Sequence, residues 1–155
     1  MVPNTEVTEV LQAKLGYGQC NLIERWVSYA VGLNNRDQCL GPLAMRRVLD
    51  RLNVELRSDS SLLFDGELRL TEDGKTIFLR EGIARSRANF TIAHELGHAA
   101  LYEIEPSLSQ DSRDIERMCN LFAAELLLPA ASMRRAMAAG SFARTLAVLA
   151  AKSGA

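Results

Sequence analysis

One stretch decides how this sequence is interpreted: Phe90-Thr-Ile-Ala-His-Glu-Leu-Gly-His-Ala-Ala-Leu101. Drawn as a helix, it carries apolar residues on nearly every side, which is typical of a helix buried in a protein core. Two histidines and a glutamate are costly to bury there unless a partner satisfies them. Gly97 is a poor helix former, and it indicates that something approaches the helix backbone closely at that turn. We therefore predict a buried helix from about Ser86 to Glu103 that carries a polar site.

The spacing of His94 and His98 points to a metal ion. Residues four apart lie on one face of a helix, so both imidazoles can hold one cation. They are the only two histidines of the chain. Glu95 flanks the pair, where a carboxylate can take the proton of a metal-bound water. Because zinc lowers the pKa of such a water toward about 7 and polarises a scissile carbonyl, we predict one catalytic zinc ion with Glu95 as general base.

The third ligand is less clear from the sequence. A catalytic zinc site needs three protein ligands and an open position, and with no third histidine the remaining ligand should be a carboxylate. The candidates that follow His98 are Glu103, Glu105, Asp111, Asp114, Glu116 and Glu125. Glu116 and Glu125 border the apolar stripe of a helix predicted from about Ser112 to Leu128, on opposite sides, so helical geometry leaves both open. Tyr102, one turn beyond His98, is a candidate donor to the oxyanion of the transition state.

The rest of the chain predicts helices on both sides of a short β region. Helices are expected over Thr5 to Leu15, Cys20 to Leu33 and Gly41 to Leu52, and two Ala-rich helices divided by Gly140-Ser141 follow Pro129. Strands are expected over Val54 to Leu56, Leu62 to Leu70 and Thr76 to Leu79, with a hairpin turn at Glu72-Asp73-Gly74-Lys75. An extended substrate is expected to bind along the edge of the strand from Thr76 to Leu79.

These elements predict one α+β domain over residues 1–155, mainly helical and zincin-like. N-terminal helices would occupy residues 1–52, and a small antiparallel β-sheet over residues 53–80 would pack beside the helix that carries His94 and His98. The active-site and C-terminal helices would occupy residues 86–152.

Composition restricts the partners and the compartment. The formal net charge is −1 and the arginines are scattered among carboxylates, so neither direct nucleic-acid binding nor attraction to an anionic membrane is expected. No apolar run reaches the roughly 18 residues of a membrane span, and no secretory signal is visible at the N-terminus. Cys20, Cys39 and Cys119 are too widely spaced for a disulfide framework or a zinc pair, which is typical of reduced thiols in a cytoplasmic protein.

Two separated segments resemble the ImmA/IrrE family of zinc metallopeptidases. The segment from Arg87 to His98 is similar to its block R-x-x-F-T-x-A-H-E-x-G-H, and the segment from Glu116 to Pro129 is similar to its block E-x-x-x-N-x-F-A-A-x-x-L-x-P. The resemblance covers about residues 60 to 150. It implies that His94, His98 and Glu116 bind one zinc ion and that Glu95 is the catalytic glutamate.

Asn120 follows Glu116 by one helical turn, so it could orient Glu116 or the bound water, or it could be a helix-capping or solvent-facing amide. The family also implies a role, the cleavage of a helix-turn-helix transcriptional repressor, so the partner would be a protein substrate that itself binds DNA.

Two other interpretations are consistent with the sequence. In the first, the domain holds zinc as a non-catalytic regulatory or interaction domain. In the second, a metal-free interaction domain uses its Ala-rich helices, from Ala130 to Lys152, to bind a partner.

Overall fold

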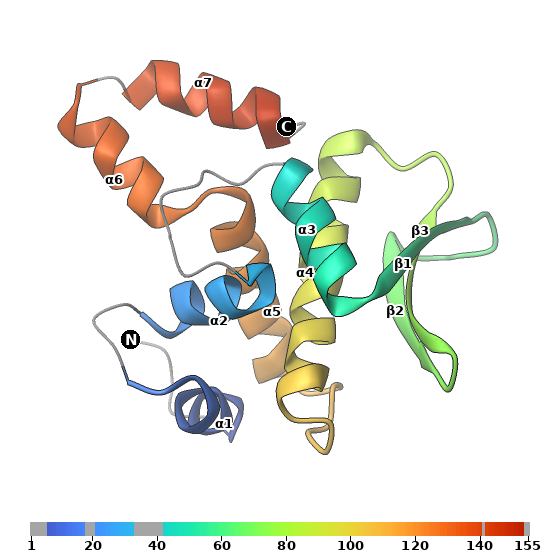
Figure 1. Cartoon of the computed structure of the whole chain (residues 1–155). Coiled ribbons are helices and arrows are strands. Elements are labelled where there is room, and N and C mark those ends of the chain that lie inside the picture. Colours follow the sequence, from blue (N-terminus) through green and yellow to red (C-terminus); the bar gives the residue numbers. More distant parts are fainter. Residues whose placement is uncertain (1–5, 18–20, 33–41, 141, 154–155) are drawn as a thin grey trace.

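The computed structural model describes residues 6–17, 21–32, 42–140 and 142–153, and it confirms a mainly helical α+β architecture (Figure 1). The elements in chain order are α1 (Glu6–Leu15), α2 (Leu22–Val31), α3 (Pro42–Leu52), β1 (Val54–Asp59), β2 (Gly66–Thr71), β3 (Gly74–Arg80), α4 (Arg85–Ile104), α5 (Arg113–Leu127), α6 (Ala130–Ala138) and α7 (Phe142–Ser153). The helix ends predicted at Thr5, Cys20, Leu33 and Gly41, together with Ser141 and Cys39, lie outside the described residues.

Helix α4 runs through the middle of the molecule, with the sheet on one side and α5 on the other (Figure 1). Its side chains Ile92, Ala93, Leu96 and Leu101 are buried, as predicted from the apolar residues on nearly every side of this helix. Helix α5 buries one stripe, and the Phe122 ring of that stripe lies 4.8 Å from the Trp26 ring of α2. The core therefore consists mainly of α4 and α5 with α2 packed across them.

Gly97 is the residue that lets α4 and α5 come close together. A Cβ atom at this position would lie 3.2 Å from Cys119 Sγ and 3.2 Å from Phe122 Cδ1, a separation tighter than nine in ten real Cβ contacts. The close approach predicted at this turn is confirmed, and the partner is α5. Cys119 is fully buried in this contact, and burial raises the pKa of its thiol well above the usual range. It packs as a small apolar residue, as its position predicts.

The sheet is mixed, so the prediction of an antiparallel sheet is wrong for one strand pair. The strand order is β1-β3-β2, with β2 antiparallel to β3 and β1 parallel to β3. The chain reverses direction in residues 60–65 and again at the hairpin, and two reversals make β1 and β3 parallel. Because β1 and β2 lie on opposite sides of β3, β1 does not pair with its neighbour in sequence.

The predicted hairpin joins β2 to β3, with a small shift. Thr71 pairs with Gly74, so Glu72 and Asp73 form the two-residue turn, and Gly74 opens β3 with a φ of 145°. That positive φ is the conformation that glycine adopts easily. The strand predicted from Leu62 is shorter in the structure, because residues 60–65 form the connection and β2 begins at Gly66.

The central position of β3 overturns the predicted substrate edge. Both sides of Thr76 to Leu79 are already paired, so that segment offers no free backbone groups for an added strand. Within the described part of the chain, the unpaired edges belong to β1 and β2, and β2 is the one that lies closest to the site-bearing part of α4. A Cβ atom on Gly66 would lie 2.7 Å from Thr91 Cγ2, which shows how tightly β2 approaches the helix.

The C-terminal helices α6 and α7 pack against each other beyond the end of α5 (Figure 1). Among the described residues, no helix combines the length and the apolar character that crossing a membrane requires.

Candidate metal centre

Two helices bring His94, His98 and Glu116 together. The histidines stand one turn apart on α4, and Glu116 lies in the first turn of α5. His94 Nε2 is 3.2 Å from Glu116 Oε2, and His98 Nε2 is 3.2 Å from Glu116 Oε1. The two Nε2 atoms are themselves 3.2 Å apart. One ligand atom of each residue lies within 4.8 Å of the others, so the three side chains converge on a common point.

The spacing of these atoms fits a zinc ion. Two atoms that each lie about 2.05 Å from a tetrahedrally coordinated zinc are roughly 3.3 Å apart. The observed separation of 3.2 Å between the two imidazole nitrogens matches that geometry. Two imidazoles and one carboxylate are also the donor set of many catalytic zinc sites, which leave the fourth position open.

The far nitrogen of each imidazole is held by an amide oxygen. His94 Nδ1 donates to Asn120 Oδ1 over 2.9 Å, and His98 Nδ1 donates to Gln110 Oε1 over 3.3 Å. With the ring protons on Nδ1, both Nε2 atoms carry free lone pairs that point toward the carboxylate. Lone pairs this close repel one another unless a cation lies between them, and fixing the tautomer in this way is the usual role of a partner to a ligating histidine.

Asn120 thus bonds to His94, whereas its helical spacing from Glu116 predicts a contact with Glu116 or the water. Gln110 was not predicted at all. It lies in the loop between α4 and α5, and its own amide nitrogen donates to Leu108 O over 3.2 Å. Loops carry no periodic pattern that marks one glutamine among several polar residues, so only the folded chain reveals this contact.

The protonation of His98 suits a metal ligand. Burial lowers the pKa of His98 below its usual value, and the neighbouring His94 lowers it further. The imidazole is therefore neutral near pH 7, the form in which it can donate a lone pair. Its side chain is only 9% exposed, which limits competition from water.

Glu95 lies between the site and the sheet. Its Oε2 accepts a hydrogen bond from the backbone nitrogen of Leu68 in β2 over 2.9 Å. Burial raises the pKa of Glu95 to about 7; the Leu68 bond lowers the pKa in part, and the nearby carboxylates of Glu116 and Glu67 raise it. A cation held by the three converging side chains would act in the opposite direction on this carboxyl group. In the absence of a cation, Glu95 is therefore a carboxyl group able to exchange a proton near neutral pH.

The remaining carboxylates considered as third ligand are occupied elsewhere or lie apart. Glu125 accepts hydrogen bonds from the Ala130 backbone nitrogen at 3.1 and 3.3 Å. Glu103 bonds to the Tyr29 hydroxyl, and Glu105 bonds to Ser107. Within the described residues, only Glu116 joins the two histidines in a group that could hold a metal ion. Tyr102 is half-buried on α4, and its proposed contact with a transition state stays a prediction.

The family comparison agrees with this geometry. The model of the IrrE N-terminal-like domain, a peptidase family, matches residues 49–151, which is about two thirds of the chain. The chain belongs to the IrrE N-terminal-like peptidase family. The family is zinc-dependent, and the matched region contains both histidines and Glu116. A search of curated proteins found no match.

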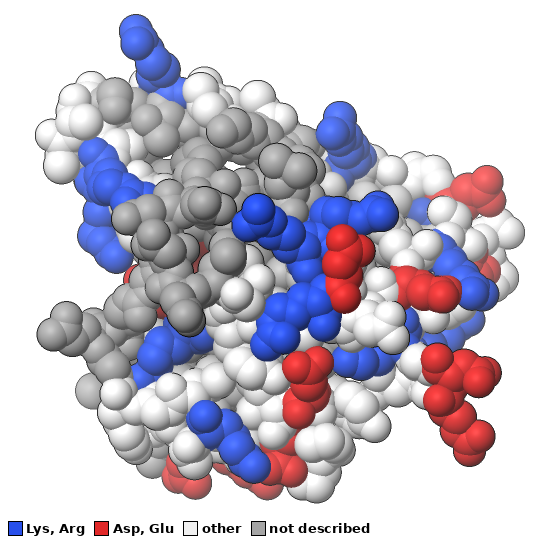
Figure 2. All heavy atoms as spheres, viewed as in Figure 1, with Lys and Arg blue, Asp and Glu red and all other residues white. Residues whose placement is uncertain are grey.

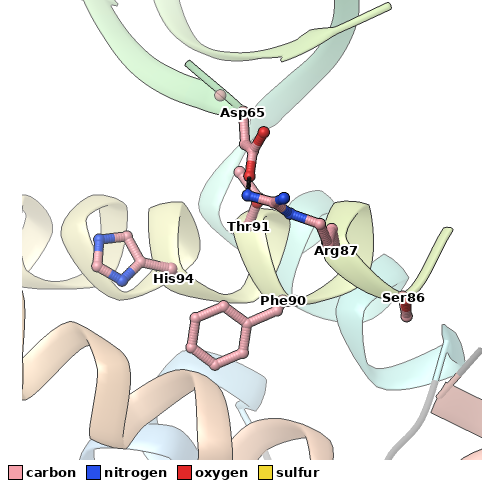
Figure 3. Close-up of a pocket in the computed structure, with 7 residues that line it drawn as sticks. Asp65, Ser86, Arg87, Phe90, Thr91 and His94 are labelled. Atoms are coloured by element: carbon pink, nitrogen blue, oxygen red, sulfur yellow. Dashed lines mark hydrogen bonds and ion pairs between the residues drawn. The ribbon is translucent and has the colours of Figure 1, made fainter. Parts of the chain in front are cut away.

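A cleft of about 570 Å³ opens beside the metal centre of this IrrE-like domain. Its floor is one face of α4, formed by Arg87, Phe90, Thr91 and His94, and one wall is the start of β2 at Asp65 and Gly66 (Figure 3). Arg87 forms an ion pair with Asp65 across the top of the helix (Figure 3). The cleft runs along the N-terminal half of α4 and ends at His94.

The Gln110 contact carries a prediction. We expect Gln110→Ala to raise the dissociation constant for zinc about tenfold, because His98 loses the acceptor that fixes its tautomer and ring orientation. Competition with a chromophoric chelator measures that constant directly. Ser109→Ala removes an exposed side chain of the same loop, and it should leave the affinity unchanged. Equal zinc affinities for Gln110→Ala and wild type would contradict the role of Gln110.

Proposed function

We propose that this protein is a zinc-dependent metallopeptidase that hydrolyses peptide bonds. The observation that carries the proposal is the convergence of His94, His98 and Glu116, with the carboxyl group of Glu95 beside them. Membership in a zinc-dependent peptidase family supports the same conclusion independently. His94, His98 and Glu116 would hold the ion.

The reaction follows from the placement of these groups. When bound, zinc would acidify a water molecule and polarise the carbonyl of the scissile peptide bond. Glu95 takes the proton of the attacking water and later passes it to the nitrogen of the leaving amine. The Leu68 backbone nitrogen holds the Glu95 carboxylate in place, so the base is oriented before the substrate arrives. Asn120 and Gln110 hold the two imidazoles in the ligating orientation.

The edge of β2 supports an extended peptide as substrate. Among the strands that the structure describes, β2 pairs with β3 alone, so its other side is open to an added strand. The backbone oxygen of Asp65 accepts a hydrogen bond from the backbone nitrogen of Arg80 in β3. Hydrogen-bonded pairs alternate along an antiparallel ladder, so the odd-numbered residues of β2 are the ones bonded to β3. The backbone groups of Gly66, Leu68 and Leu70 therefore point away from β3, and of these the Leu68 nitrogen already donates to Glu95 Oε2. An added strand would lie alongside this edge, over the α4 face that carries Phe90 and His94.

The resemblance to the ImmA/IrrE family suggests which kind of polypeptide is the substrate. We infer a regulatory protease that cleaves a helix-turn-helix transcriptional repressor in the cytoplasm, as the two sequence blocks imply. Basic and acidic side chains are interspersed on the face of the molecule shown in Figure 2, which supports a protein partner and not direct contact with nucleic acid. The alternative is a non-catalytic zinc-containing regulatory domain with the same three ligands.

Metal analysis combined with a hydrolysis assay tests the proposal. The purified protein should contain one zinc per chain and cleave casein or a helix-turn-helix repressor; a chelator should stop cleavage and zinc should restore it. Absence of bound zinc after zinc loading would refute the metal centre. Bound zinc with no cleavage of either substrate would favour the non-catalytic domain.

A further inference from the structure

An exposed aromatic ring marks the cleft beside the metal centre. Phe90 lies on the floor of the cleft, one helical turn before His94, and it is 42% exposed. A large apolar side chain this exposed gains free energy when a ligand covers it. Figure 3 shows its ring at one border of this helix face and the Asp65–Arg87 ion pair at the other. The cleft therefore has one apolar side and one charged side.

The charged side of the cleft is already paired. The two carboxylate oxygens of Asp65 each meet an arginine, Arg80 at 2.7 Å and Arg87 as the second partner. A basic side chain entering the cleft would have to compete with two guanidinium groups for one carboxylate. Phe90 is the large apolar side chain of the lining, and contact with it requires no ion pair to break.

The direction of β2 decides which part of a substrate reaches this cleft. Gly66 lies against Thr91, and Leu68 bonds to Glu95, so β2 and α4 advance in the same direction. A strand added antiparallel to β2, the slightly more stable pairing, would run from Leu70 toward Gly66. Its chain would pass the metal centre first and the cleft afterwards. The cleft would therefore hold residues on the carboxyl side of the scissile bond.

We propose that this cleft receives the side chain of the residue that follows the scissile bond, and that Phe90 selects a large apolar side chain there. The inference rests on the proposed zinc peptidase function, since the metal centre defines the scissile position. Phe90 would act by burying substrate surface against its ring, which makes it a residue that determines specificity.

A series of zinc-binding peptide hydroxamates tests the inference without requiring turnover. The compounds place leucine, alanine, aspartate or lysine at the first position on the carboxyl side of the hydroxamate. Calorimetric titration of the zinc-loaded protein should show the leucine compound binding about tenfold tighter than the alanine compound, because a few buried carbon atoms have roughly that effect. In Phe90→Ser the preference should fall to about twofold.

Leu121→Ser is the matched control. Leu121 is a large apolar residue on α5 with a similar exposure of 40%, and it borders a separate hollow between α2 and α5. This variant should keep the full tenfold preference. If the wild type prefers lysine, Asp65 is the recognising group and the inference is overturned. Equal binding of the leucine and alanine compounds, or a preference that survives in Phe90→Ser, overturns it too.

The same titration separates this inference from the function on which it rests. Hydroxamate binding that depends on zinc but ignores the side chain would leave the metal centre intact and remove only the role of Phe90. Failure of every hydroxamate to bind the zinc-loaded protein would instead refute an open catalytic zinc site, and with it both proposals.

Discussion

Glu95→Gln is expected to keep one zinc per chain while peptide hydrolysis falls about 1000-fold. Glutamine has nearly the same shape as glutamate, and its carbonyl oxygen can still accept the hydrogen bond from the Leu68 nitrogen. It cannot take a proton from the attacking water, and general-base catalysis contributes typically about 10²- to 10⁴-fold. Initial rates of casein cleavage and elemental analysis of the same samples measure both quantities.

Glu103→Gln is the control for a lost carboxylate on the same helix. Glu103 lies two turns after Glu95 on α4, and it bonds to the Tyr29 hydroxyl at 2.8 Å, away from the histidines. Its removal should change neither the zinc content nor the rate. Full activity in Glu95→Gln would show that another group serves as the base, whatever the metal content.

The sequence predicted those features that depend on one helix at a time. The positions of His94 and His98 on one face of a helix, with Glu95 beside them, follow from helical periodicity, and α4 carries a buried His98 with His94 and Glu95 half-buried. Gly97 predicted a close approach for the same local reason, because a helix interior normally disfavours glycine. The ends of α4 and α5 also agree with the predicted ends within a residue.

Features that depend on how elements meet were not predictable in this way. The hairpin between β2 and β3 was visible from Asp73-Gly74, but the partner of β1 is set by the connection over residues 60–65, whose path no local pattern fixes. The substrate edge was misplaced for that reason, since β3 is central only once β1 has joined it. Gln110 was missed because its contact with His98 exists only when the loop folds back over α4.

The choice between Glu116 and Glu125 as third metal ligand also depends on how α4 and α5 pack against each other. Glu116 and Glu125 border the same apolar stripe, and their nine-residue separation places them at opposite ends of α5. The close approach at Gly97 sets α5 against α4 and brings the first turn of α5, with Glu116, opposite His94 and His98. Glu125 then lies in the last turn, next to the start of α6.

Glu116→Ala is therefore expected to weaken zinc binding by more than about 100-fold. Loss of an outer partner of a ligand typically costs about 10- to 100-fold in metal affinity, and loss of a ligand itself should cost more. Two imidazoles alone would share the ion with water, and the negative charge that balances the cation would be gone. Competition titration with a chelator of known affinity gives the dissociation constant, and hydrolysis should disappear at zinc concentrations that saturate the wild type.

Glu125→Ala separates a ligand from a structural carboxylate. Glu125 accepts from the Ala130 nitrogen at the start of α6, so its loss should lower the free energy of unfolding by about 1 kcal/mol, the usual effect of a helix cap. Zinc affinity should stay at the wild-type value. If Glu125→Ala loses the metal and Glu116→Ala retains it, the assignment of the third ligand is wrong. Loss of metal in one variant and loss of stability in the other would assign Glu116 to the metal centre and Glu125 to the start of α6, at opposite ends of α5.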